Sequence, residues 1–206
     1  MKLKTLNPIK IFLEGEDKEE LLQSIISNDL SKYNSNFYSY ILTPQGKILF
    51  EIQVILKNNF IEIICTNDQA DLFSFLNKFV KLSEVQVKKI HIEQSHYNFE
   101  YFTESLKKGR IDTNFIEHST LLPSEVHDEY IDYNKGCFIG QEVVSRIKHR
   151  NLKKKKVLVF NKNNDFELER LDNSQIILDI NSFVILRIPT VTNVFELEKN
   201  YKLTKI

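Results

Sequence analysis

The sequence predicts an α+β fold, in which an antiparallel sheet with flanking helices is followed by a small C-terminal β-barrel. Two helical patterns with one apolar face enclose three strand-like runs that are joined by tight turns. After a run of lysines, the chain continues as short apolar runs separated by turn-forming residues, which is typical of a small barrel or sandwich. With 206 residues, the chain suffices for one large domain or two small ones. We therefore expect two domains, at 1–150 and 151–206.

In the first domain, the spacing of the apolar residues predicts the strands of the sheet and its flanking helices. Helices are expected where leucine, isoleucine and phenylalanine recur at helical spacing, and strands where apolar runs are bounded by turns. Pro44 and Gly46 favour a tight turn between the first two strands. The expected elements are a helix at 17–27, strands at 37–43, 47–56 and 59–66, a helix from about residue 68, a strand at 85–93, a helix at 98–112 ending near Gly109, and a helix at 139–149.

The second domain consists of short runs that predict strands. They contain β-branched and aromatic residues and are separated by asparagine, aspartate, serine and proline. No internal repeat is present. The expected strands are residues 156–160, 174–180, 183–188 and 193–197.

The composition is that of an ordinary globular protein, with 42% hydrophobic and 27% charged residues and no net charge. No stretch approaches the ~18 consecutive apolar residues that a membrane helix needs. The N-terminal residues lack the apolar core of a secretory signal. We therefore expect a monomer in a bacterial cytoplasm, with the mitochondrial matrix as the alternative compartment.

Only two cysteines are present, and they have different surroundings. Cys65 lies in an apolar run and is expected to be a small core residue. Cys137 lies between Gly136 and Gly140, which let the backbone turn tightly and a ligand approach closely. Lys135 and the amides of the helix expected after Gly140 favour a thiolate, the form that acts as a nucleophile or metal ligand. A buried cysteine in a glycine turn is the alternative that these residues alone leave open.

Three motifs, in order along the chain, resemble the YgfZ family. Residues 13–30 are similar to the family's G-x-D…L-Q-x-x-x-x-N-D opening, and residues 42–51 to its L-x-P-Q-G-K hairpin. Residues 135–142, with the sequence KGCFIGQE, match the pattern K-G-C-aromatic-x-G-Q-E. The chain is thereby identified as a relative of the folate-binding YgfZ proteins.

The resemblance implies a fold like that of the aminomethyltransferase T-protein of the glycine cleavage system, with a folate site near its centre. It also implies a role with iron–sulfur enzymes, including those that modify tRNA, and therefore iron–sulfur enzymes or assembly proteins as partners. Cys137 is the implied active residue, with Lys135 beside it, and no resident metal is expected. The residues implied to bind tetrahydrofolate are Asn28, Asp29, Gln45, Lys47, Glu51, Gly136, Phe138, Gln141, Glu142, Arg146, Lys148 and Arg150.

The sequence departs from the family pattern at two carboxylates and is shortened in its middle. Lys107 and Lys108 precede Gly109, where relatives carry the carboxylate that binds the pterin in T-proteins. The paired aspartates of the T-protein hairpin correspond to Phe50 and Glu51, so one carboxylate remains. Classical enzymatic turnover is therefore not expected.

A basic stretch from 146 to 156 contains no acidic residue. Arg146, Lys148 and Arg150 could hold the acidic tail of folate, or the stretch could contact RNA phosphates. A solvated helix end is the plain alternative, and no aromatic residues interleave with the lysines for base stacking. Four hypotheses follow. The first is a folate-dependent accessory factor for iron–sulfur enzymes, and the second is a one-carbon transferase that uses tetrahydrofolate. The third is an RNA-binding accessory protein, although direct nucleic-acid binding is not expected, and the fourth is a reduced relative that keeps the cysteine motif but has lost its ligand.

Overall fold

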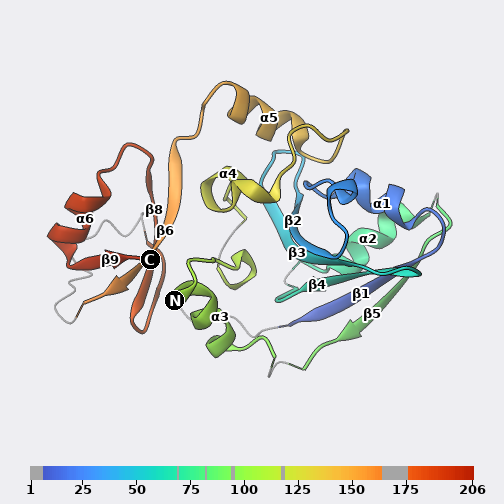
Figure 1. Ribbon diagram of the computed structural model, residues 1–206, viewed down its shortest axis with the longest axis horizontal. Helices are drawn as coiled ribbons and strands as arrows, with labels where there is room; N and C mark the ends of the chain where they lie inside the picture. Colours follow the sequence, from blue (N-terminus) through green and yellow to red (C-terminus); the bar gives the residue numbers. More distant parts are fainter. Residues whose placement is uncertain (1–6, 69, 82, 94–95, 117–118, 164–175) are drawn as a thin grey trace.

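The computed structural model describes residues 7–68, 70–81, 83–93, 96–116, 119–163 and 176–206. Its larger part contains a five-stranded antiparallel sheet with the strand order β2-β3-β4-β1-β5 (Figure 1). The expected antiparallel sheet is thereby confirmed. Its strands are β1 (Ile9–Glu14), β2 (Asn36–Leu42), β3 (Ile48–Leu56), β4 (Phe60–Cys65) and β5 (Gln86–His91).

Strand β1 was not expected from the sequence, although it lies inside the sheet between β4 and β5. Its apolar residues Ile9, Ile11 and Leu13 alternate with partly exposed ones and are themselves fully buried. This period-two pattern is typical of a strand with one face on the core.

Two helices cover one face of this sheet, α1 (Lys18–Ile25) and α2 (Leu72–Val80), and share one hydrophobic cluster with it (Figure 1). Leu22 and Leu76 are fully buried there. The other face carries α3 (Phe99–Lys107), with Phe102 and Leu106 buried. All three helices confirm the helical periodicity in the sequence.

Helix α3 ends in a Schellman motif. Gly109 has a φ of +72°, its N–H donates to the carbonyl of Leu106, and the N–H of Arg110 donates to the carbonyl of Ser105. The expected C-cap at Gly109 is confirmed. The motif reverses the chain and sends Arg110 back toward the sheet.

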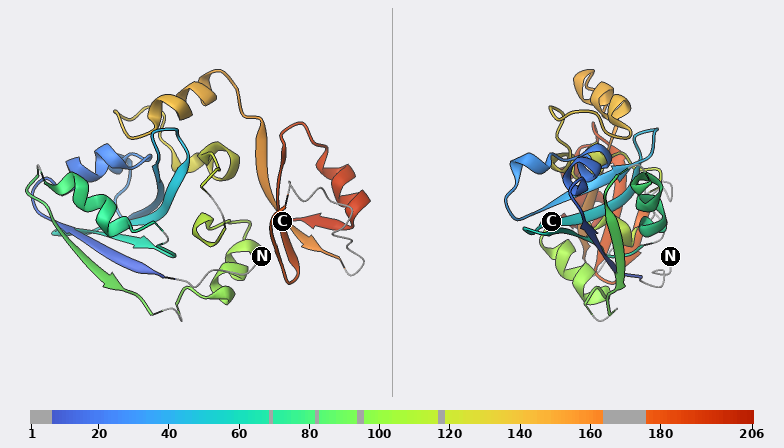
Figure 2. Two further views of the ribbon diagram at one scale, coloured as in Figure 1. Left: turned by 180° about the vertical axis from the view of Figure 1, so that it is seen from behind. Right: turned by 90° about the vertical axis from the view of Figure 1, so that its right-hand side faces the viewer.

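Short elements connect α3 to the second sheet: α4 (Pro123–Val126), α5 (Gln141–His149) and 3-10 turns at Thr113–Phe115 and Asp128–Tyr130. A further 3-10 turn, at Leu30–Lys32, lies between α1 and β2. Helix α5, expected at 139–149, is confirmed and crosses from one sheet to the other (Figures 1 and 2). In the described part of the chain, no helix is long and apolar enough to cross a membrane.

The second sheet is antiparallel and has the order β7-β8-β6-β9. The expected runs at 156–160 and 183–188 are strands; the run at 174–180 is a strand from residue 176, and its first two residues lie outside the described residues. No closed barrel is found among the described strands, so the barrel is not confirmed. The elements are β6 (Lys155–Lys162), β7 (Ile176–Ile180), β8 (Phe183–Pro189), α6 (Val194–Tyr201) and β9 (Leu203–Lys205).

The strand expected at 193–197 is wrong, because these residues begin helix α6. The side chain of Asn193 caps the helix by accepting from the N–H of Phe195. Val194, Leu197 and Tyr201 lie at helical spacing and pack on the second sheet. The apolar run was too short to distinguish a helix from a strand.

The two sheets share a hydrophobic cluster. It joins Tyr40 and Leu42 of β2 with Phe102 of α3 and with Val159 and Ile185 of the second sheet. Arg187 of β8 also donates to both carboxylate oxygens of Glu125 in α4, at 2.9 and 2.8 Å. The expected boundary near residue 151 therefore separates two sheets that contact each other, and its use as a domain boundary stays a prediction.

Candidate functional site

Cys137 lies on an exposed loop between the 3-10 turn Asp128–Tyr130 and α5. Cys65, the other cysteine, is fully buried in β4, as the sequence predicted. Burial raises the pKa of the Cys65 thiol well above its usual value, so this group stays protonated and inert. Cys137 is therefore the thiol that a partner can reach.

Lys135 holds the start of this loop against the C-terminal end of α1. Its buried ammonium donates to the backbone carbonyls of Gln23, Ile26 and Asn28 at 2.6, 2.7 and 3.0 Å. A cation at this end complements the helix dipole and satisfies carbonyls that the helix leaves free. Burial lowers the pKa of Lys135 to about 8. Its three protons are thus used in fixing the loop to the first motif.

Two glycines hold the other end of the loop against the turn between β2 and β3. Gly140 has a φ of +83°, and a Cβ there would lie 2.5 Å from the carbonyl oxygen of Thr43. Gly46 has a φ of +73°, and a Cβ there would lie 3.0 Å from Cβ of Val143 in α5. Both positions thus require glycine for backbone angle and for space. The three motifs of the sequence meet at this place.

Most of the residues expected to bind folate near this loop have structural contacts. The side chain of Asn28 donates to the Tyr38 carbonyl and the Tyr33 hydroxyl, both at 3.0 Å. Lys47 donates to the carbonyl of Thr120 at 2.8 Å, and Gln141 donates to that of Lys135. Phe138 is buried, with the Lys135 ammonium 5.2 Å from its ring centre, while Gly136, Gln45 and Glu142 are exposed.

The expected basic residues lie on α5 and at its end. Lys148 pairs with Asp128 at 2.6 Å and lies over the ring of Tyr133. Arg146 and Arg150 are exposed. The pKa of Asp128 is lowered, because hydrogen bonds from Lys148 and Tyr133 outweigh its desolvation. Lys148 therefore connects α5 to the segment before Cys137, and this contact has a structural role.

Glu51 is separated from these residues and lies in a buried cluster on β3, with 1% of its surface exposed. One carboxylate oxygen accepts from the Arg110 guanidinium at 2.5 Å. The other accepts from the backbone N–H and the hydroxyl of Thr113 at 2.8 and 2.7 Å. Asn114 adds hydrogen bonds to the Glu51 backbone on both sides. The loop after α3 is thus clamped onto β3.

The Arg110 guanidinium is enclosed by aromatic side chains. It lies 4.2 Å from the ring centre of Tyr38 and donates to the hydroxyls of Tyr101 and Tyr130 at 3.3 and 3.4 Å. The Asp112 carboxylate lies 3.7 Å away and itself accepts from the hydroxyl of Thr66. Cation–π contact and ion pairing both stabilise a guanidinium in such a cage.

The charges of this cluster do not balance, because two buried carboxylates face one guanidinium. Burial and the Asp112 carboxylate raise the pKa of Glu51 to about 7, against the opposing effect of Arg110. Burial opposes the charge on Arg110, but Glu51 and Asp112 together raise its pKa. Tyr40, opposite Glu51 on β2, is fully buried, and its hydroxyl has no hydrogen-bond partner among the described residues.

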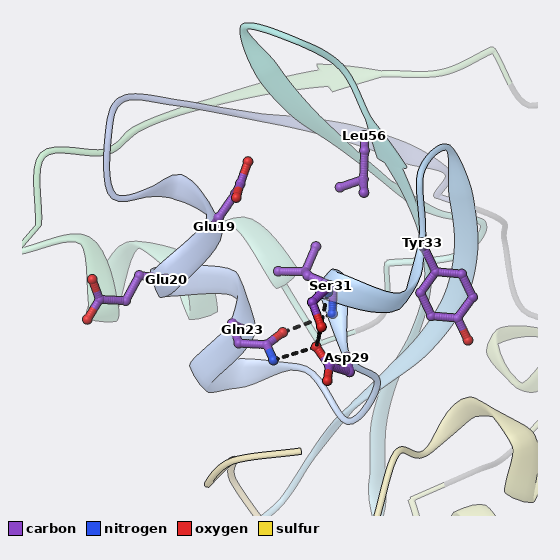
Figure 3. Close-up of a pocket in the computed structure, with 8 residues that line it drawn as sticks. Glu19, Glu20, Gln23, Asp29, Ser31, Tyr33 and Leu56 are labelled. Atoms are coloured by element: carbon purple, nitrogen blue, oxygen red, sulfur yellow. Dashed lines mark hydrogen bonds between the residues drawn. The ribbon is translucent and has the colours of Figure 1, made fainter. Parts of the chain in front are cut away.

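An open pocket of about 540 Å³ lies between α1 and the 3-10 turn that follows it (Figure 3). Asp29 lies in this pocket and accepts from the side chain of Gln23 and from Ser31. These hydrogen bonds, that from the Ser31 hydroxyl foremost, lower the pKa of Asp29. The residues around it are Glu19, Glu20, Gln23, Asp29, Leu30, Ser31, Tyr33 and Leu56, which include three carboxylates and no cation.

Known proteins resemble this chain in sequence and in fold. No protein-family model matches the chain. A curated protein of Neurospora crassa, named a mitochondrial iron–sulfur cluster assembly factor IBA57 homolog, is 20% identical over 72% of this chain. The alignment covers 50% of that relative, so the chain spans about half its length. The crystal structure of aminomethyltransferase T of the glycine cleavage system from Bartonella henselae superposes with a TM-score of 0.61 and 12% identity, covering 88% of this chain and 76% of that one.

The chain is YgfZ-like and has the T-protein fold. The likeness to YgfZ rests on the Neurospora relative and agrees with the three motifs. The fold rests on the match to the solved aminomethyltransferase. Since the match to the solved structure is only 12% identical, it carries the fold and no activity.

Among the described residues of this YgfZ-like chain, two cavities lined by expected folate residues, one beside Glu51 and one beside Asp29, do not fit tetrahydrofolate. The cavity beside Glu51 holds about 10 Å³, room for one water, whereas ligand pockets usually measure about 300–1,000 Å³. The pocket at Asp29 is wide enough but acidic, so it repels the glutamate tail of folate. Glu104 is the carboxylate of α3 that could replace the one missing before Gly109, but it is exposed, pairs with Lys107 at 2.6 Å and does not line the Glu51 cavity.

Sequence reasoning missed the partners of Glu51 in this YgfZ-like chain. Arg110 lies 59 positions from Glu51, and Tyr130 lies 20 positions from Arg110. No local spacing connects residues that far apart. The one available signal was Arg110 and Asp112, which directly follow the helix end at Gly109 and flank a buried isoleucine.

Proposed function

We propose that this chain is an accessory factor for the assembly or maintenance of iron–sulfur proteins and that it acts through Cys137. The observation that carries the proposal is the exposure of this thiol on a loop whose two ends are fixed, by Lys135 on one side and Gly140 on the other. The Neurospora relative is named as an iron–sulfur cluster assembly factor, and this supports the same assignment, as do the three motifs that resemble the YgfZ family.

The loop suits a group that is handed between proteins. An exposed thiol can bind iron or an iron–sulfur cluster as a thiolate, and its accessibility lets a second protein approach the same atom. A fixed backbone keeps the sulfur in one place without further ordering at the moment of binding. Iron, sulfur or a cluster is the cargo in this proposal, and the partners are iron–sulfur enzymes or assembly proteins.

A complementation experiment tests this proposal. Cells that lack the protein are supplied with the wild type, Cys137→Ala or Asn134→Ala, and the activity of an iron–sulfur enzyme is measured against that of an enzyme without a cluster. We expect Cys137→Ala to fall to the level of the deletion. Asn134 is exposed in the same loop, so its variant should behave as the wild type. Equal iron–sulfur activity with Cys137→Ala and wild type would remove the proposal.

The part played by folate stays a prediction, and so does the compartment. Titration of the wild type with tetrahydrofolate by calorimetry, compared with the double variant Lys148→Glu/Arg150→Glu, tests whether the basic face of α5 holds the folate tail. Saturable binding weakened by the charge reversals would support a folate-dependent factor. If the double variant binds tetrahydrofolate as tightly as the wild type, the basic face of α5 does not hold the folate tail.

A further inference from the structure

Arg110 has no part in the proposed function, yet all parts of its guanidinium are engaged. Nε and one terminal nitrogen donate to the hydroxyls of Tyr130 and Tyr101, and the other terminal nitrogen donates to Glu51. Its central carbon lies over the ring of Tyr38, 4.2 Å from the ring centre. The cavity that remains beside it holds about 10 Å³. Arg110 thus fills the space over Glu51.

The chemistry of a guanidinium matches the recognition edge of a pterin. The 2-amino-4-oxopyrimidine ring of a pterin contains a cyclic acylated guanidine, whose N3–H and 2-amino group are parallel donors in one plane. A carboxylate accepts from such a pair, and an aromatic ring stacks on its flat face. Glu51 and Tyr38 offer these two surfaces, and the fold is one for which the sequence predicted a folate site with Glu51 in it.

We propose that Arg110 is the built-in occupant of the Glu51 cavity and closes it to pterins. The arginine takes one carboxylate oxygen of Glu51 and the face of Tyr38, and Thr113 takes the other oxygen, so neither surface is left for the ring of such a ligand. Glu51, Asp112 and the tyrosines therefore serve to hold an internal guanidinium.

The backbone keeps this occupant in place. The Schellman motif at Gly109 sets the direction in which Arg110 leaves α3. Three residues later, Thr113 is bound to Glu51 through both its N–H and its hydroxyl, and Asn114 is bound to the Glu51 backbone. Since the chain is anchored on both sides of Arg110, moving the arginine out of the cavity requires breaking these contacts. We call Arg110 in this arrangement the plug of the Glu51 cavity, since the backbone on both sides holds it in place.

The first test measures binding to the wild type and uses Glu51→Gln as the site control, after circular dichroism has shown that this variant is folded. Calorimetric titration with tetrahydrofolate should give no saturable binding at the Glu51 cavity, and therefore no binding that Glu51→Gln abolishes. Saturable binding in the wild type that is lost in Glu51→Gln would overturn the proposal, since a pterin would then displace Arg110.

The second test opens the cavity. Arg110→Ala removes the atoms of an ethylguanidinium ion, so this ion is the matched probe. We expect ethylguanidinium to raise the thermal unfolding midpoint of Arg110→Ala by a few degrees at saturation, and to leave that of the wild type unchanged. Ethylammonium, which has the charge without the planar fork, should have a much smaller effect. Equal shifts in variant and wild type would contradict the plug.

These tests are independent of Cys137. A failure of the plug shows in binding and in unfolding midpoints, whereas a failure of the proposed function shows in the activity of iron–sulfur enzymes with Cys137→Ala. Either idea can fail while the other stands.

Discussion

The Cys137 loop and the Arg110 cluster are built in opposite ways on the same sheet. In the loop, a buried lysine and two glycines fix the backbone, and the reactive atom is left exposed. In the cluster, charged side chains are the buried part, and they are paired with one another. The reactive group of the loop is therefore accessible to a partner, whereas the charged groups of the cluster contact one another.

This difference predicts that mutations in the loop change function, whereas mutations in the cluster change stability. The loop places little of its contact energy in the exposed thiol, so changing Cys137 should affect function and leave stability unchanged. The cluster holds charges that cannot be solvated when a partner is lost, so changing Arg110 should affect stability first.

The largest effect is expected for Arg110→Met, which keeps most of the volume and removes the charge. Glu51 and Asp112 then face each other without a counter-ion, and breaking a buried pair in this way costs about 3–5 kcal/mol. Urea unfolding measures the loss. Lys107→Met, which removes an exposed pair with Glu104 on the same helix, is the control and should leave the midpoint nearly unchanged. Equal effects of the two variants would contradict the buried cluster.

The second prediction concerns pH. The pKa of Glu51 is raised from 4.5 to about 7 in the folded state, so the folded protein binds a proton that the unfolded chain has lost. The associated stabilisation is complete below pH 4.5 and disappears as the pH rises through about 7, a change of roughly 3 kcal/mol. The free energy of unfolding of the wild type should therefore fall over this range relative to Glu51→Gln. Parallel curves for the two proteins would show that Glu51 is already ionised at low pH.

A smaller effect is expected at the glycines of the loop. Gly140→Ala forces a side chain into a left-handed conformation and against the Thr43 carbonyl, which should destabilise the protein by about 1–3 kcal/mol. Gly136→Ala is the matched control, since a Cβ at that position meets nothing within 4 Å. Thermal unfolding compares the two, and a larger loss for Gly136→Ala would refute the packing of the loop on the hairpin turn.

The smallest structural effect is expected for the thiols. Cys137 should react with a chromogenic disulfide reagent in the native protein, whereas Cys65 should react only as fast as the core opens. Counting thiols against time, with and without denaturant, measures both. Cys137→Ser should remove the fast phase and leave the unfolding midpoint where it was. A fast phase that persists in this variant would mean that Cys65 is accessible.

Local pattern predicted the elements whose apolar residues repeat over several turns or pleats. Helices α1, α2 and α5 and strands β2, β3 and β4 follow from such repeats. The run at 193–197 was ambiguous, because five residues with three apolar side chains are too few to distinguish a strand from a helix. The Asn193 cap and the packing of Leu197 are what the structure adds to make it a helix. Strand β1 was overlooked although its pattern was present.

The sequence by itself determined the family resemblance and the buried role of Cys65, because both depend on residues that are neighbours in the chain. It left open whether Cys137 is buried or exposed, and the structure has this thiol on the surface. Only the tertiary structure decided what surrounds Glu51. Its partners come from β2, the end of α3 and the loop before α5, and they meet because the sheet and the Schellman motif bring those segments together. A buried charge is defined by what encloses it in space, and no spacing along the chain records that.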